Sequence, residues 1–403
     1  MKNQNRIIPK IRFINFNDKW KYKTLDEISN AIEYGINAPA KDFDGIHKYL
    51  RITDIDDNSR LFLNVKLSSP DVNFTEENYE NYKLQKNDLL FARTGASVGK
   101  TYLYRESDGE VYYAGFLIRA RLHDSYDGNF VFQQTLTDKY KQFIDITSQR
   151  SGQPGVNGKE YGDWKIGITS YSEQSAIGSL FRTLDGLLAS YKDNLANYQS
   201  LKATMLFKMF PKAGQTVPEI RLDGFEGEWE TKILSEVTNI TMGQSPKSEN
   251  YTDNPNDYIL VQGNADIKDK QVVPRLWTTE VTKMAEIGDI ILTVRAPVGD
   301  IGKTDYNVVI GRGVAAIKGT DFIFYALEKM KNTGFWNRFS TGSTFESISS
   351  NDIKEAIIQI PTLKEQQAIG AYFSNLDDLI NSQQEKISQL ETLKKKLLQD
   401  MFI

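Results

Sequence analysis

The strongest constraint on how this chain can fold is an internal repeat that aligns without a gap. Residues 172–188, SEQSAIGSLFRTLDGLL, return as residues 364–380, KEQQAIGAYFSNLDDLI, at an offset of 192 residues. Apolar residues recur in steps of three and four, which is the heptad spacing of helices that pair with one another. The expected seam positions are Ile177, Phe181, Leu184, Leu188 and Leu195 in the first copy, and Ile369, Phe373, Leu376, Ile380, Ile387 and Leu390 in the second.

Both helices are predicted to be long, because neither residues 170–210 nor residues 362–402 contain a proline. A helix of this length spans ~55 Å at 1.5 Å per residue. A domain of ~130 residues has a radius of gyration of only about 14 Å, so a helix lying entirely on its own domain is the less favoured alternative. Since a globular segment separates the two helices, we expect them to pair antiparallel.

The start of each helix carries two further matched features. Ser170 with Glu173, and Thr362 with Glu365, have the spacing of a capping box, in which each side chain bonds the other residue's backbone amide. Gly178 and Gly370 occupy equivalent positions in the two copies. These glycines either permit a close backbone approach or are simply tolerated, and the sequence leaves both interpretations open.

A weaker repeat precedes each globular segment. IPKIRFINFNDKWKYKTLDEI from Ile8 returns as VPEIRLDGFEGEWETKILSEV from Val217. We call residues 8–20 and 217–229 the lead-in segments. The predicted order is domain, helix, domain, helix, with boundaries at 1–165, 166–212, 213–357 and 358–403.

The fold class expected from this order is α+β, with two globular domains separated by two long helices in an antiparallel coiled coil and an internal pseudo-two-fold symmetry. Short strands are predicted among helices in both domains. The expected strands include 89–93, 111–121 and 289–294, and the expected helices include 130–146 and 322–339.

The stretch GASVGKT at 95–101 resembles a phosphate-binding P-loop, but only three residues separate Gly95 from Gly99, where a P-loop has four. Tyr102-Leu103-Tyr104 follows, which favours a strand where a P-loop requires a helix. We therefore predict a glycine turn between two strands. A looser echo at 288–304 aligns Arg93 with Arg295, and Gly99-Lys100-Thr101 with Gly302-Lys303-Thr304.

Composition limits the chemistry of the chain. Cysteine is absent, which excludes disulfides, thiolate zinc sites and cysteine nucleophiles, and the only imidazoles are His47 and His123. No apolar run has the length of a signal peptide or a membrane span, so we expect a soluble, cytoplasmic protein with no membrane partner. A net charge of -4 gives no signal for nucleic-acid binding, although a partner subunit can supply positive charge.

Taken together, these motifs resemble the specificity subunit of Type I restriction-modification systems over nearly the whole chain. The motifs are the two lead-in segments, the strand-turn regions at 88–99 and 289–302, the loops at 151–158 and 341–349, and the helix start at 361–369. The first helix departs from the family pattern, because Ser170-Tyr171-Ser172 replaces a proline-containing start.

The resemblance implies a non-catalytic protein with two target-recognition domains, each reading half of a bipartite sequence in double-stranded DNA. The helices would space these domains and dock two modification subunits, which bind S-adenosylmethionine and methylate adenine. Restriction subunits would join with their ATP and Mg, while no cofactor is expected on this chain. Two alternatives are a self-contained restriction enzyme or methyltransferase, and a protein scaffold that binds no nucleic acid.

Candidates for DNA contact lie on the glycine turns and on the loops before the helices. They are Arg93, Thr94, Ser97, Lys100, Gln153, Asn157, Arg295, Lys303, Ser343 and Thr344. Cations and amides at such turns can clamp phosphates, and Gln and Asn can pair with adenine. Solvated loop charges are an equal alternative for the cations, and turn formation is favoured for Gln153 and Asn157. Stacking of Tyr112, Tyr113 or Phe116 on a flipped base is possible chemistry, but core packing is favoured.

Overall fold

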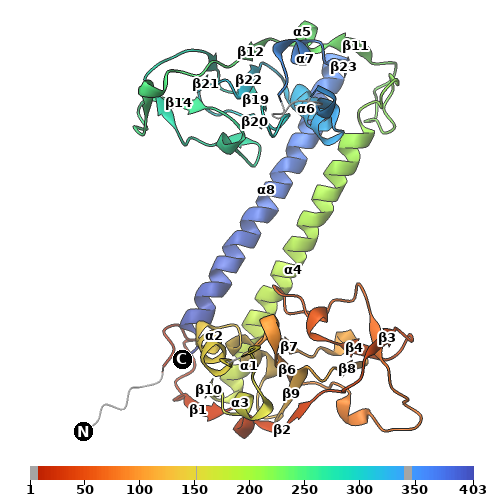
Figure 1. Ribbon diagram of the computed structural model, residues 1–403, viewed down its shortest axis with the longest axis vertical. Coiled ribbons are helices and arrows are strands. Elements are labelled where there is room, and N and C mark those ends of the chain that lie inside the picture. The colour runs from red at the N-terminus through yellow and green to blue at the C-terminus, as the bar shows by residue number, and fades with distance from the viewer. Residues whose placement is uncertain (1–7, 151, 340–346) are drawn as a thin grey trace. The chain divides into compact units, whose positions relative to one another are not determined.

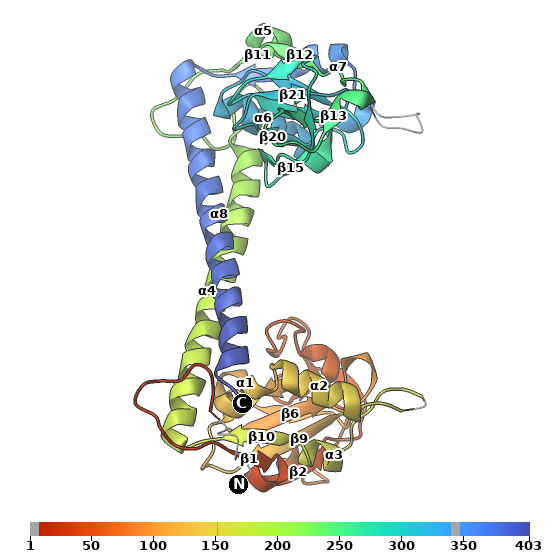
Figure 2. The same cartoon turned by 90° about the vertical axis from the view of Figure 1, so that its left-hand side faces the viewer.

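The computed structural model describes residues 8–150, 152–339 and 347–403 (Figures 1 and 2). The chain forms two compact units. Unit 1 comprises residues 1–192 and 385–403, and unit 2 comprises residues 193–384. The fold is α+β, as expected, and both long helices contribute to both units. These helices are α4, Tyr171–Lys208, and α8, Leu363–Asp400, of 38 residues each.

Unit 1 is built around a four-stranded antiparallel sheet in the order β2-β9-β6-β7. Its strands are β2 (Ser29–Tyr34), β9 (Leu117–Leu122), β6 (Asp88–Ala92) and β7 (Thr101–Leu103). Smaller pairs are β1 (Lys21–Thr24) with β10 (Lys165–Ile168), β3 (Ala40–Asp42) with β5 (Ser68–Pro70), and β4 (Lys48–Leu50) parallel to β8 (Val111–Tyr113). The helices of this unit besides α4 and α8 are α1 (Gly128–Gln134), α2 (Asp138–Thr147) and α3 (Gly158–Gly162).

Unit 2 repeats this plan with more strands. A six-stranded sheet runs β12 (Ile240–Met242), β22 (Val314–Ile317), β19 (Ile290–Thr293), β20 (Ile301–Lys303), β16 (Gln271–Val272) and β15 (Ile267–Lys268). A five-stranded sheet runs β13 (Tyr251–Thr252), β17 (Trp277–Thr278), β14 (Tyr258–Val261), β21 (Val308–Ile310) and β18 (Met284–Ala285). β11 (Glu230–Ile233) pairs with β23 (Ile357–Ile360), and the shorter helices are α5 (Leu234–Val237), α6 (Asp321–Asn332) and α7 (Ser350–Lys354).

Three predicted elements are interrupted in the structure. The expected strand 111–121 divides into β8 and β9, because the chain changes pairing partners between them, from β4 to β2 and β6. The expected helix 130–146 divides into α1 and α2, because the Thr137 side chain accepts a hydrogen bond from the backbone amide of Tyr140 and starts a new helix. The expected helix 322–339 ends at Asn332, and a 3-10 helix follows at Phe335–Phe339.

Each lead-in segment is tied to the start of a long helix by a buried ion pair, and the two pairs are equivalent. Arg12 donates to Glu173 at 2.6 Å and 2.7 Å, and Arg221 donates to Glu365 at 2.8 Å and 2.8 Å. The predicted capping boxes are therefore wrong for the glutamate side chains. These carboxylates accept from the lead-in arginines instead of from a backbone amide at the helix start. Thr362 still caps α8, since its hydroxyl accepts from the Glu365 amide at 3.4 Å.

The lead-in segments also contact the end of a long helix in the same way in both units. In unit 1 the Ile11 amide donates to the Asp400 carbonyl at 2.9 Å, and in unit 2 the Ile220 amide donates to the Lys208 carbonyl at 3.0 Å. In unit 2 a short linker joins these two elements covalently. In unit 1 the same contact holds the N-terminal segment against the end of α8.

The long helices pair antiparallel, and a polar junction in each unit joins them to a domain helix. Asp185 of α4 accepts from Lys394 of α8 at 2.6 Å and from Gln133 of α1 at 3.0 Å. In unit 2, Asp377 of α8 accepts from Lys202 of α4 at 2.5 Å and from Tyr325 of α6 at 3.0 Å. The two junctions occupy equivalent positions in the repeat.

The predicted seam residues divide into two groups. Those nearest each helix start are buried in the core of the adjoining domain, together with residues from the end of the other helix. This group is Ile177, Phe181 and Leu184 in unit 1, and Ile369, Phe373 and Leu376 in unit 2. Leu188 and Ile380 are buried farther along, while Leu195, Ile387 and Leu390 are only half-buried. The alternative of a helix lying on its own domain is thus correct for the first turns of each helix.

The matched glycines do permit a close approach, but to a domain helix. A Cβ atom on Gly178 would lie 2.4 Å from Asp127 Oδ1, which caps α1, and one on Gly370 would lie 2.9 Å from Asp321 Cβ at the start of α6. Glycine is therefore needed at both positions for the domain helix to reach the long helix. Among the described residues, no helix has the combined length and apolar character of a membrane span.

Candidate nucleic-acid interface

The stretch GASVGKT forms a turn between two strands, as predicted. β6 and β7 are paired antiparallel, and Gly95 and Gly99 both adopt left-handed backbone conformations, with φ of 77° and 83°. Such values favour glycine, because other side chains rarely adopt them. The turn leads into a strand, so it lacks the helix N-terminus on which a P-loop depends.

The equivalent turn in unit 2 lies between β19 and β20, and strand register corrects the alignment expected from the sequence. Leu89 pairs with Leu103 and Ala120, while Ile290 pairs with Lys303 and Ile317, so Leu89 and Ile290 are equivalent. Arg295 therefore corresponds to Thr94, and Lys303 corresponds to Leu103. The shared letters of the two Gly-Lys-Thr runs do not mark equivalent positions. The reason is that hydrogen-bond register in the hairpins, rather than residue identity, sets the correspondence.

In unit 1 the loop before α3 lies against this turn. The Gly95 amide donates to the Pro154 carbonyl at 3.0 Å, and the Val156 amide donates to the Arg93 carbonyl at 2.9 Å. The exposed Gln153 side chain reaches the same turn, since a Cβ on Gly95 would lie 3.0 Å from its Nε2 atom. The structure thus brings Arg93, Thr94 and Gln153 together on one surface.

Arg93 lies between two exposed aromatic rings on that surface. Its guanidinium carbon is 5.1 Å from the ring centre of Tyr34 and 5.9 Å from that of Phe116, both within cation–π range. Tyr34 is 44% exposed and Phe116 is 60% exposed. Rings at the surface beside a cation can stack on bases while the cation binds phosphate or a guanine edge.

Core packing was expected for three aromatic residues, and the structure separates them. Tyr112 and Tyr113 are buried, as predicted, whereas the expectation is wrong for Phe116, which lies on the turn between β8 and β9. The pair Gly115-Phe116 is a turn signal in the sequence that could have indicated this exposure. Tyr34 was not identified from the sequence, because it is the last residue of an ordinary strand.

Two of the candidate cations form ion pairs with carboxylates of their own unit. Lys100 is only 8% exposed, and its ammonium lies 3.1 Å from the Ile55 carbonyl and 2.5 Å from Asp57 Oδ1. Lys303 forms an ion pair with Asp321 and lies over the ring of Phe324. Both ammonium groups are therefore held by carboxylates of the protein in this structure, and contact of either lysine with phosphate stays a prediction. The partners of both lysines are distant in sequence, so no local pattern indicates these ion pairs or the burial of Lys100.

The remaining candidates have less distinctive surroundings. Asn157 is the N-cap of α3, accepting from the Glu160 amide at 2.9 Å, which agrees with its turn-forming interpretation. Ser97 is half-buried within the 3-10 turn at Gly95–Ser97. Arg295 is exposed. Ser343 and Thr344 lie outside the described residues.

The corresponding surface of unit 2 has different chemistry. By strand register, Gly313 takes the place of Phe116, and exposed Arg312 precedes it. Nearby, the Gln262 side chain donates to the Tyr251 hydroxyl at 2.7 Å and its carbonyl oxygen lies 3.3 Å from the Ser245 hydroxyl. Unit 1 therefore presents aromatic rings around an arginine, and unit 2 presents a hydrogen-bonded polar network beside arginines.

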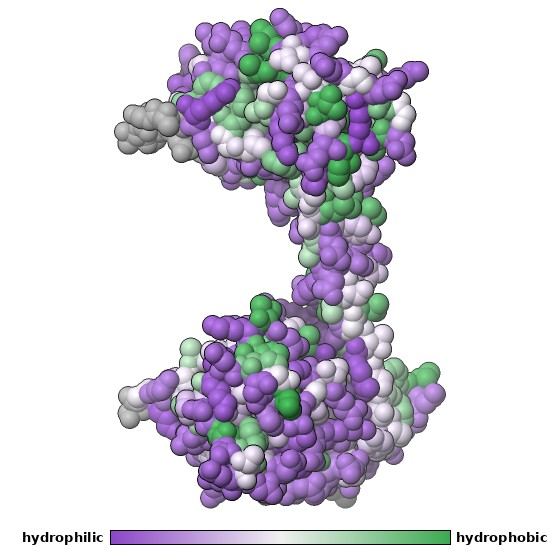
Figure 3. All heavy atoms as spheres, turned by 90° about the vertical axis from the view of Figure 1, so that its right-hand side faces the viewer, coloured by the Kyte–Doolittle hydropathy of each residue, from purple (hydrophilic) through white to green (hydrophobic). Residues whose placement is uncertain are grey.

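The described residues contain no group of three or more His, Asp or Glu side chains arranged to hold a metal ion. The face drawn in Figure 3 shows each unit covered mainly by hydrophilic side chains with scattered apolar residues.

Comparison with known proteins agrees with this architecture. A sequence-family profile described as "Type I restriction modification DNA specificity domain" matches residues 226–392. The chain is 25% identical over 397 residues to the putative type I restriction enzyme MjaX specificity subunit of Methanocaldococcus jannaschii, covering 94% of this chain and 92% of the relative. It is 20% identical over 337 residues to the MjaVIII specificity subunit of the same organism, covering 78% of each chain.

Solved structures share the fold. The Type-I restriction-modification system S subunit from M. genitalium matches with a TM-score of 0.67 at 17% identity, covering 98% of this chain and 99% of that one. A chain from a structure of complex assembly in a type I R-M system matches with a TM-score of 0.53 at 22% identity, covering 94% and 96%. The chain is thus similar in sequence to Type I restriction-modification specificity subunits, over part of its length by the family profile and over nearly all of it by one relative, and it shares their fold.

Proposed function

We propose that this chain is the DNA-specificity subunit of a Type I restriction-modification complex. It reads a bipartite target with a fixed gap and docks two adenine-methyltransferase subunits, through which restriction subunits join. Catalysis, S-adenosylmethionine, ATP and Mg belong to those partners, and the complex acts on DNA in the cytoplasm.

The observation that carries the proposal is a repeated framework with two different surfaces. Both units share the lead-in ion pair, the polar junction and the helix-start glycine at equivalent positions. The turn surfaces differ, with Tyr34, Arg93 and Phe116 in unit 1, and Arg295 and Arg312 in unit 2. A framework that repeats while its exposed side chains differ is what two half-site readers require.

The long helices support docking of two copies of one partner. Leu187 and Leu393 are exposed on the helix pair in unit 1, and Leu379 and Leu201 are their equivalents in unit 2. All four are between 38% and 44% exposed. Exposed apolar residues that recur at matching positions fit one kind of partner surface used twice.

Sequencing of methylated adenines in cells with and without this chain tests the proposal. We expect a bipartite motif that disappears with the chain. Replacing residues 15–165 by the same domain of a relative should change one half-site and leave the other unchanged. A simultaneous change in both half-sites would contradict the two-reader arrangement.

Incubating the purified chain with DNA and S-adenosylmethionine distinguishes the proposed specificity subunit from a self-contained enzyme. We expect no methyl transfer until methyltransferase subunits are added. Methyl transfer by the chain alone would overturn the assignment of catalysis to partner subunits. Footprinting of the complex on DNA tests the scaffold alternative, which predicts that no defined sequence is protected.

A further inference from the structure

A large basic cleft lies in unit 1 on the side of the β6–β7 hairpin away from the glycine turn. Its volume is about 990 Å³, and it is bounded by α4, the last turns of α8, α1 and the loop around residues 57–61. Seven Lys and Arg side chains line it against four Asp and Glu side chains. The charge of the lining therefore opposes the net negative charge of the whole chain.

Five of these cations have no salt bridge with the described residues. They are Arg60, Lys86, Arg105, Arg182 and Lys395. The other two are neutralised in place, because Lys192 pairs with Glu391 at 2.7 Å and Lys394 pairs with Asp185 at 2.6 Å. The cleft is therefore lined by five cationic side chains that no salt bridge with the described residues neutralises.

Arg60 is the most constrained of the five. Its backbone is left-handed, with φ of 59°, a conformation that costs energy for any residue but glycine. Burial lowers the pKa of its guanidinium, because the group has lost water without gaining a salt bridge among the described residues. A desolvated guanidinium without a salt bridge would regain favourable electrostatic interactions from an anion in the cleft.

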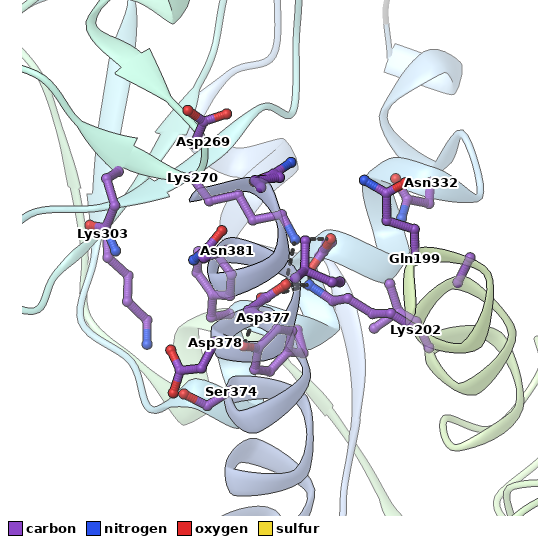
Figure 4. A pocket seen from close by; sticks show the side chains of 18 residues that line it. Gln199, Lys202, Asp269, Lys270, Lys303, Asn332, Ser374, Asp377, Asp378 and Asn381 are labelled. Atoms are coloured by element: carbon purple, nitrogen blue, oxygen red, sulfur yellow. Dashed lines mark hydrogen bonds and ion pairs between the residues drawn. The ribbon is translucent and has the colours of Figure 1, made fainter. Parts of the chain in front are cut away.

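Unit 2 contains a cleft at the equivalent place, and its three lysines are already paired with carboxylates (Figure 4). Its volume is about 370 Å³. Lys202 bonds Asp377 at 2.5 Å, Lys270 bonds Glu328 at 2.5 Å, and Lys303 forms an ion pair with Asp321. This cleft has no cationic surplus to offer a ligand.

The internal repeat shows which residues make the difference. Arg182 and Lys395 of unit 1 correspond to Ser374 and Ala203 of unit 2, and Gly186 corresponds to Asp378. Two cations are therefore absent from the second cleft and one carboxylate is added. Of these two equivalent clefts, only that of unit 1 has an excess of cations among the described residues.

We propose that the basic cleft of unit 1 binds the phosphodiester backbone of DNA, independently of base sequence. This inference rests on the proposed function, because it assumes that DNA already lies on the turn surface of the same unit. Lys86 and Arg93 stand at the two ends of β6 and are at most ~25 Å apart along an extended chain. A duplex rises about 3.4 Å per base pair, so at most about seven base pairs separate the two places.

Salt-dependent binding tests the cleft. The variant R182S/K395A gives unit 1 the side chains of unit 2, and K386A/K396A removes two exposed lysines of α8 that do not line the cleft. We expect the full-length R182S/K395A chain to bind a 40-base-pair duplex on the order of tenfold more weakly at 100 mM KCl, with a log–log salt slope shallower by about 1.8. Equal losses in both variants, or an unchanged slope in R182S/K395A, would overturn the proposal.

An acidic protein segment is the competing occupant. Polyglutamate serves as its probe, and it should displace the duplex from the cleft only weakly. If R182S/K395A lost polyglutamate or methyltransferase-subunit binding while its DNA slope stayed at the unaltered value, the cleft would be a protein site and the proposal would fail.

Position is tested with a cysteine-linked iron chelate, which cleaves nearby DNA. Because the chain has no cysteine, Arg182→Cys and Ser374→Cys each introduce a single attachment site. We expect cleavage beside one half-site from position 182 and little from position 374. Equal cleavage from both positions would contradict a cleft that acts once per chain.

The outcomes for the cleft and for the proposed function are distinguishable. R182S/K395A should leave the sequence of the methylated motif unchanged, since the base-reading residues are not altered, although binding is weaker. Absence of any chain-dependent motif with the unaltered protein would overturn the proposed function itself.

Discussion

At the scale of single residues, the most consequential groups are two carboxylates buried at the starts of the long helices. Glu173 and Glu365 are almost fully excluded from solvent, and each is held by one arginine of a lead-in segment. A buried pair of this kind adds little net stability over apolar residues, but removing one partner leaves an uncompensated charge. The arginines therefore fasten each lead-in segment to its unit.

Arg12→Ala is expected to destabilise unit 1 by about 3–5 kcal/mol, and Arg221→Ala to destabilise unit 2 similarly, because each strands a buried glutamate. Hydrogen exchange resolved by unit measures this, with the unaltered unit as internal control. The double change Arg12→Met with Glu173→Leu should recover much of the loss. Equal opening of both units by Arg12→Ala would contradict a local role for the pair.

Lys329 makes the stability of unit 2 depend on pH. Burial lowers its pKa to about 8, and its ammonium donates to the Pro211 carbonyl at 2.5 Å. The unfolded chain, with an ordinary lysine pKa of about 10.4, binds more protons than the folded chain above pH 8, so unfolding becomes harder as pH rises.

The expected result is that unit 2 gains stability relative to Lys329→Met between about pH 8 and pH 10.4. Urea unfolding of both proteins across that range, monitored by exchange in α6, makes the comparison. A difference that stays constant with pH would show that Lys329 keeps an ordinary pKa in the folded protein.

At the scale of elements, each long helix is coupled to a domain helix and to the other long helix at the same point. Asp185 and Asp377 each accept from one lysine across the helix pair and from one side chain of a domain helix. About two turns closer to the helix start, Gly178 and Gly370 lack the side chain that would block the approach of the domain helix. Packing and polar bonding therefore fix the same relation between helices in both units.

Two glycines of α4, Gly178 and Gly186, provide a matched test within one helix. Gly178→Ala would force a Cβ against the carboxylate that caps α1, and we expect a cost of about 1–3 kcal/mol despite the better helix propensity of alanine. Gly186→Ala, in the same helix with nothing within 4 Å of the added atom, should instead stabilise by about 0.5–1 kcal/mol.

Chemical denaturation of the two variants gives both values. Gly370→Ala is the corresponding test in unit 2, where the added atom would meet Asp321 at 2.9 Å. Stabilisation by all three changes would contradict the close approach at the helix starts.

At the scale of the whole molecule, both long helices run from one unit into the other. The polar junctions at Asp185–Lys394 and Lys202–Asp377 lie outside the middle of the helix pair. Lengthening the middle by whole heptads therefore leaves both junctions intact and keeps apolar positions on the seam.

Insertion of one heptad after Tyr198 and one after Leu390 should lengthen the pair by ~10 Å at 1.5 Å per residue. Since B-DNA rises about 3.4 Å per base pair, we expect the gap between half-sites to grow by roughly three base pairs, with twist and bending absorbing the added rotation. Methylation mapping measures the gap. The original gap in a folded, active variant would contradict helices that set the spacing, while unchanged half-sites serve as the control.

The sequence by itself determined the features that depend on spacing along the chain: the long paired helices, the duplicated order and the turn at Gly95–Gly99. Periodicity and turn residues act locally, so they can be identified without knowing the fold. Only the tertiary structure decided which residues belong to the candidate interface. It exposed Phe116 and Tyr34 around Arg93, buried Lys100 and paired Arg12 with Glu173. It also moved Arg295 out of register with Arg93. These outcomes depend on strand register and on partners far away in sequence, because burial and ion pairing arise from contacts that no local pattern records.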